Sequence, residues 1–110
     1  MIHTPLVCET DASTEVIEHT ETITQVIDRL QKAPQEHYAR FFREGDGLRE
    51  LEVRLIDGEY RLEARLGDGT AMTRYRAFYK DVEDVLEICW AYYEHDEAPD
   101  MISWTDITHG

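Results

Sequence analysis

The sequence lacks the residue patterns that mark most enzymes and metalloproteins. Its two cysteines, Cys8 and Cys89, and its five scattered histidines do not have the short spacings of a zinc site. There is no Gly-x-Ser-x-Gly motif, and no glycine-rich loop stands between a strand pattern and a helix pattern, as a phosphate-binding loop requires. We therefore expect that the protein is not an enzyme and that it binds no metal and no cofactor.

Long apolar runs and an excess of basic residues are also missing. No stretch approaches the run of about 18 apolar residues that a membrane helix needs, and residues 1–8 lack the features of a signal peptide. The chain has 11 Lys and Arg against 24 Asp and Glu, which gives a net charge of −13. Nucleic acids and anionic membranes attract basic surfaces. We therefore expect a cytoplasmic protein with neither nucleic acid nor membrane as a partner.

Length and apolar content indicate a single domain over residues 1–110. The 110 residues are 42% hydrophobic, which is enough for one core and too little for two. Apolar residues at helical spacing predict a helix near 22–33, with Thr22 at its N-cap in a capping box. A second helix is predicted to follow the N-cap residue Asp81 and to end near His95.

Between these helices the sequence predicts four strands in a meander, separated by turns that contain glycine. Alternating apolar residues predict strands within 37–43, 50–56, 59–66 and 70–79. A short final strand is expected within 101–107. The expected fold is α+β: a two-layer domain with a mainly antiparallel sheet of four to five strands and two helices on one face.

Asp57-Gly58 is the strongest turn signal in the chain. A two-residue hairpin there sets Leu55 opposite Tyr60, so that the apolar faces of the two strands match. The same register places like charges directly across and opposite charges on the diagonals. The like-charged pairs are Arg54 with Arg61 and Glu52 with Glu63.

Acidic residues are concentrated at the C-terminal end of the chain. Residues 80–110 hold nine acids and one base, whereas residues 37–79 hold eight of each. An uneven distribution of this kind favours an acidic surface that meets a basic protein. The candidate contact residues are acids on one helical stripe, the acids that follow them, and two tryptophans that could anchor a partner: Glu83, Glu87, Glu94, Asp96, Glu97, Trp90 and Trp104.

In size, charge and layout the chain resembles the small acidic immunity proteins of bacterial polymorphic and contact-dependent toxin systems. The most similar stretches are 82–93 (VEDVLEICWAYY) and 103–107 (SWTDI). The resemblance implies a non-catalytic α+β domain that binds and blocks a toxin, commonly a basic nuclease. Two other hypotheses stay open: a DNA-mimicking phage inhibitor, such as an anti-restriction or anti-CRISPR protein, and a small enzyme or ligand-binding domain with a pocket between sheet and helices.

Overall fold

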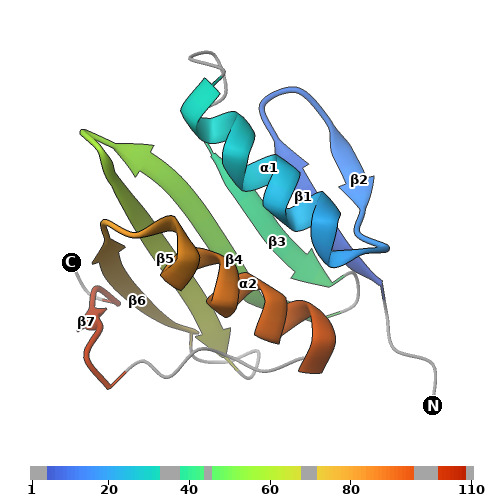
Figure 1. Cartoon of the computed structure of the whole chain (residues 1–110). Helices are drawn as coiled ribbons and strands as arrows, with labels where there is room; N and C mark the ends of the chain where they lie inside the picture. Colours follow the sequence, from blue (N-terminus) through green and yellow to red (C-terminus); the bar gives the residue numbers. More distant parts are fainter. Residues whose placement is uncertain (1–4, 33–37, 44–45, 68–71, 96–101, 109–110) are drawn as a thin grey trace.

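The fold has two layers, a seven-stranded antiparallel sheet and two helices that lie side by side on one of its faces (Figure 1). The computed structural model describes residues 5–32, 38–43, 46–67, 72–95 and 102–108. The strand order across the sheet is β2-β1-β3-β4-β5-β6-β7. In chain order the elements are β1 (Leu6–Thr10), β2 (Thr14–Val16), α1 (Thr20–Lys32), β3 (Ala39–Arg43), β4 (Asp46–Ile56), β5 (Glu59–Gly67), β6 (Met72–Tyr79), α2 (Val82–His95) and β7 (Thr105–Asp106).

The hairpin between β4 and β5 has the predicted turn and register. Asp57 and Gly58 have φ angles of 52° and 82°, as expected for a two-residue turn in which both central residues are left-handed. Leu55 pairs with Tyr60, which confirms the register. The like-charged pairs also lie directly across from each other, as predicted.

The sheet is larger than the predicted four to five strands, mainly because β1 was not expected. Leu6, Cys8 and Thr10 of β1 are buried, while Val7 and Glu9 between them are only partly buried. This alternation is hard to see in the sequence, since Cys and Thr are weakly apolar and Val7 points to the other face. β1 is held on both sides, by β2 and by β3, so tertiary pairing rather than local pattern places it in the sheet.

The final strand is shorter than the expected 101–107. Only Thr105 and Asp106 pair with β6, and they form β7. Ile102 is exposed while Trp104 is buried, so these two residues do not share one apolar face of a strand. Residue 101 lies outside the described residues. Because only two residues of this segment pair with β6, the buried side chain of Trp104 is what anchors the segment to the domain.

Both predicted helices are present, with one correction at the start of α1. The helix begins at Thr20, and the backbone N–H of Thr22 donates to the carbonyl oxygen of His19 at 3.1 Å. The predicted cap at Thr22 is therefore wrong, because Thr22 already lies in the first turn. The predicted N-cap of α2 is confirmed, since the backbone N–H of Glu83 donates to Oδ1 of Asp81 at 3.0 Å.

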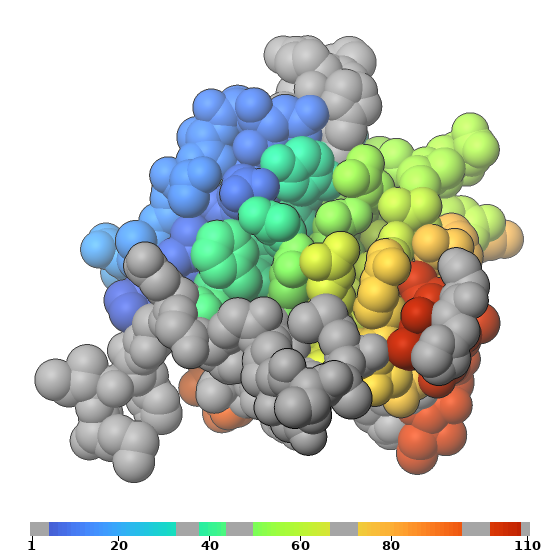
Figure 2. All heavy atoms as spheres, turned by 180° about the vertical axis from the view of Figure 1, so that it is seen from behind, coloured from blue at the N-terminus to red at the C-terminus, as the bar shows by residue number. Residues whose placement is uncertain are grey.

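The core lies between the helices and the sheet face beneath them. Its largest fully buried side chains include Tyr60, Tyr92, Phe41 and Leu6, each worth about 1.5–3 kcal/mol of burial. Because side chains alternate along each strand, every second residue of the sheet points to the opposite face. Figure 2 shows the molecule from that side. None of the described helices is long and apolar enough to span a membrane.

Candidate functional site

Two charged surfaces stand out, one on the outer side of α2 and one on the sheet face away from the helices. On α2, the acidic stripe consists of Glu83, Glu87 and Glu94, which are all exposed. At 100° per residue their directions differ by about 40° at most. Within the described part of the chain, neither Glu83 nor Glu87 lies within ion-pair distance of a cation. Among the described residues, the one cation that Glu94 approaches is the neighbouring His95, at 3.9 Å.

Helix stability accounts for part of this acid but not for all of it. Glu83 and Asp84 lie in the first turn of α2, where negative charge is favourable beside the helix dipole. Glu94 lies at the other end of the helix, where the dipole disfavours a carboxylate. The helix dipole therefore does not account for the acid at Glu94, which extends the stripe along the exposed outer surface of α2.

The two tryptophans that were predicted as anchors have different environments. Trp90 is partly buried against the core, at the border of the acidic stripe, and its Nε1 is buried with no hydrogen-bond acceptor among the described residues. Trp104 is only 6% exposed, and its Nε1 donates to the hydroxyl of Tyr79 at 2.9 Å. Trp104 thus belongs to the core, and Trp90 is the tryptophan that a partner could reach. Asp96 and Glu97 lie outside the described residues.

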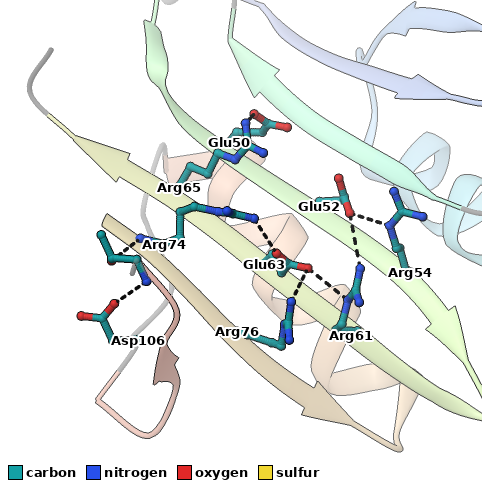
Figure 3. A network of polar contacts seen from close by, with 10 residues as sticks. Glu50, Glu52, Arg54, Arg61, Glu63, Arg65, Arg74, Arg76 and Asp106 are labelled. Atoms are coloured by element: carbon teal, nitrogen blue, oxygen red, sulfur yellow. Dashed lines mark hydrogen bonds and ion pairs between the residues drawn. The ribbon is translucent and has the colours of Figure 1, made fainter. Parts of the chain in front are cut away.

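The sheet face away from the helices carries a lattice of arginines and glutamates, which we call the arginine–glutamate face (Figure 3). The alternation of side chains along β1, β3, β4, β5 and β6 brings these residues to one surface. Its members are Glu9, Glu50, Glu52, Glu63, Arg40, Arg54, Arg61, Arg65, Arg74 and Arg76.

Glu63 is the centre of this lattice. Its carboxylate oxygens lie 3.2 Å from Nη2 of Arg74, 3.4 Å from Nη2 of Arg76 and 3.1 Å from Nε of Arg61. The contact with Arg61 is an ion pair rather than a directed hydrogen bond, because the Nε of Arg61 has no acceptor in favourable geometry. The side chain of Glu63 is only 12% exposed. One largely enclosed acid therefore holds three guanidinium groups together.

Two further glutamates extend the lattice across the strands. Glu52 accepts from Nε of Arg54 at 2.6 Å and lies 4.0 Å from Nη2 of Arg61. The hydrogen bond from Arg54 to Glu52 is the main cause that raises the pKa of the Arg54 side chain above its usual value. Glu50 bridges Arg40 and Arg65, at 3.2 and 3.5 Å. These contacts run along β4, directly across to Arg65 and diagonally to Arg61 and Arg40, and they offset the repulsion between the like charges that the register places side by side.

The lattice continues to β1 through Glu9. Nη2 of Arg40 lies 2.8 Å from Oε2 of Glu9, and the Tyr38 hydroxyl donates to the other oxygen of Glu9 at 2.9 Å. This hydrogen bond, which only the protonated hydroxyl can donate, raises the pKa of Tyr38. The sequence predicted the charge pattern of one hairpin, but the contributions of Glu9 and Arg40 depend on β1, which it did not reveal.

Two of the hollows on the described surface have different linings that bear on function. One, of about 340 Å³, lies on the arginine–glutamate face and is lined by Glu50, Glu52, Glu63, Arg54, Arg61, Arg65, Arg74 and Arg76. The other, of about 220 Å³, lies between α1 and α2 and is lined by Thr24, Gln25, Asp28, Gln31, Val82 and Leu86. In the second hollow Asp28 pairs with the exposed Lys32 at 2.9 Å. The hollow in the sheet is therefore the one that concentrates charged groups.

Comparison with known proteins gives no family assignment. No protein-family model, no curated protein and no solved structure matches the chain. Among the described residues, no group of three or more His, Cys, Asp and Glu side chains is placed to hold a metal ion.

Proposed function

We propose that this protein is an inhibitor that acts by binding and not by catalysis, and that its partner is a basic bacterial toxin. In this role it is an immunity protein of the cytoplasm. Its cysteines, Cys8 and Cys89, form no disulfide, as is usual for proteins of that compartment. The observation that carries the proposal is the acidic stripe. The glutamates of the arginine–glutamate face are held by arginines, whereas Glu83 and Glu87 on α2 have no described counter-charge.

An uncompensated acidic helix supports rapid capture of a basic partner. The local field of such a surface raises the rate of encounter with an oppositely charged protein, and salt weakens that effect. Trp90, at the border of the stripe, supplies apolar area next to the charges. A central aromatic residue with a charged rim is a common arrangement at protein interfaces. The charges would then govern association, and Trp90 would govern dissociation.

The experiment compares binding kinetics of two charge-reversed variants with the purified product of the adjacent reading frame as the toxin. Glu83→Lys with Glu87→Lys should slow association by about tenfold at physiological salt, because both changes lie on the stripe. The matched control is Glu18→Lys with Glu21→Lys, two exposed acids just before α1 and in its first turn. It changes the net charge equally and should leave association within about twofold. Circular dichroism checks that both variants are folded.

Trp90→Ala should act mainly on the dissociation rate, with thermal stability measured beside it, because Trp90 also packs against the core. Unchanged rates for a folded Glu83→Lys, Glu87→Lys variant would refute the stripe as the contact surface. The absence of any complex with the neighbouring gene product, together with failure to protect cells from it, would refute the immunity function itself.

A further inference from the structure

The arginine–glutamate face has the opposite charge balance to the rest of the protein. Its six arginines outnumber its four glutamates, although the whole chain has a net charge of −13. The excess is concentrated in the hollow of about 340 Å³, whose described lining has five arginines and three glutamates. The solubility of a strongly acidic protein does not require a positively charged hollow, so this feature calls for another explanation.

The arginines at the β6 side of this hollow have unused hydrogen-bonding capacity. Among the described residues, the side chains of Arg74 and Arg76 each pair with Glu63 alone, through Nη2, and the Nε of each is buried with no acceptor in this part of the chain. A guanidinium group has five N–H donors in a planar fork that matches a carboxylate. Both side chains are partly exposed. Their remaining Nη N–H groups can therefore donate to a second carboxylate from outside the molecule.

The hollow is bordered by an exposed aromatic ring. Phe78 follows Arg76 on the same side of β6 and is 54% exposed. It lies opposite Arg61 of the neighbouring strand β5. Arginine and aromatic residues are the types most enriched at protein interfaces, where the arginine supplies directed bonds and the ring supplies apolar area. This combination fits a protein segment better than it fits a single small anion.

We propose that the arginine–glutamate face is a second docking site and that its occupant is an acidic segment of another protein, rich in Asp and Glu. The charge complementarity is local, since the remainder of the chain repels such a segment. The arginines are spread over β4, β5 and β6, so several carboxylates of one chain can be held at once. The site lies on the face opposite α2 and does not rest on the function proposed above.

The probe is a fluorescein-labelled peptide of ten glutamates, followed by fluorescence anisotropy at about 20 mM salt, where screening is weak. Wild-type protein should bind it, and binding should weaken as salt rises. Arg74→Gln with Arg76→Gln should lower the affinity by about tenfold, the effect of losing two partly exposed charge pairs. The matched control is Arg29→Gln with Lys32→Gln on α1, which removes the same charge and should change the affinity by less than about twofold.

Three results would overturn the proposal. They are the absence of peptide binding by wild-type protein, equal losses in the two double variants, and displacement of the peptide by inorganic phosphate at concentrations similar to that of the peptide. Sedimentation that shows self-association abolished by Arg74→Gln with Arg76→Gln would assign the face to a second copy of this chain and would equally refute an acidic partner. If that double variant does not fold, Arg65→Gln, at a side chain 44% exposed, should weaken binding by about threefold, and an unchanged affinity would count against the site.

Discussion

Arg43 donates from Nη2 to the carbonyl oxygen of Tyr92 at 3.0 Å, and so joins the end of β3 to the C-terminal turn of α2. The same nitrogen lies 3.2 Å from the carbonyl oxygen of Tyr93, and the guanidinium carbon lies 5.6 Å from the centre of the Tyr92 ring. The last carbonyls of a helix have no partner within the helix and carry partial negative charge. A cation buried in the core thus caps α2, the helix that carries the acidic stripe.

Arg43→Met should lower the free energy of unfolding by about 2–3 kcal/mol, because it removes charge-assisted hydrogen bonds and leaves buried carbonyls unpaired. Arg43 is only 7% exposed, so water cannot easily replace it. Arg65→Met, at a side chain 44% exposed, is the matched control and should cost less than about 1 kcal/mol. Urea denaturation measures both values. Equal losses in the two variants would mean that the cap contributes little.

Gly58→Ala should cost about 1–2 kcal/mol, because Gly58 has a φ of 82° and an L-residue is strained there. Nothing lies within 4 Å of the position of an added Cβ, so the cost comes from backbone conformation and not from a clash. Asp57→Gly, at the neighbouring φ of 52°, should stay within about 0.5 kcal/mol of wild type. Thermal denaturation of the pair tests this, and a neutral Gly58→Ala would contradict the left-handed turn.

Tyr79→Phe should lower stability by about 1–2 kcal/mol, because it leaves the buried Nε1 of Trp104 without the acceptor that now lies 2.9 Å away. Tyr75 lies on the same face of β6 and makes no hydrogen bond through its hydroxyl with the described residues. Tyr75→Phe should therefore change stability by less than about 0.5 kcal/mol. Chemical denaturation followed by tryptophan fluorescence compares the two. A smaller loss at Tyr79 than at Tyr75 would show that this bond does not hold the C-terminal segment.

Stability should fall as the pH rises above about 9. Complete burial raises the pKa of the Cys89 thiol well above its ordinary value of 9.0, and burial also raises the pKa of Tyr60 above 10.0. The folded protein therefore keeps protons that the unfolded chain releases. The stabilisation is complete below the unfolded pKa values and is lost above them, at about 1.4 kcal/mol per pH unit for each such proton.

Denaturation curves between about pH 8 and pH 10.5 measure this slope. Cys89→Ala should be less stable than wild type at every pH, because it leaves a cavity, but its stability should fall less steeply between pH 9 and pH 10. A slope that Cys89→Ala does not reduce would show that the thiol titrates alike in the folded and unfolded chains.

Local sequence signals were sufficient for the parts of the fold that form over short distances. The periodicity of α2 and the capping residue Asp81 act within one helix, and Asp57-Gly58 sets a register between neighbouring strands. β1 is different, because its Cys8 becomes a core residue, and its Thr10 is buried, only when β3 pairs beside them. The apolar pattern was therefore weakest where the strand depends on partners that are distant along the chain.

The candidate surfaces divide in the same way. The sequence by itself determined the acidic stripe of α2, since helical spacing alone brings Glu83, Glu87 and Glu94 to one side. Tertiary structure alone decided that Trp104 is buried, and that arginines from β6 share the carboxylate of Glu63 from β5. The reason is physical: a helix sets its own faces through bonds between near neighbours, whereas the chemistry of a sheet surface depends on which strands lie side by side.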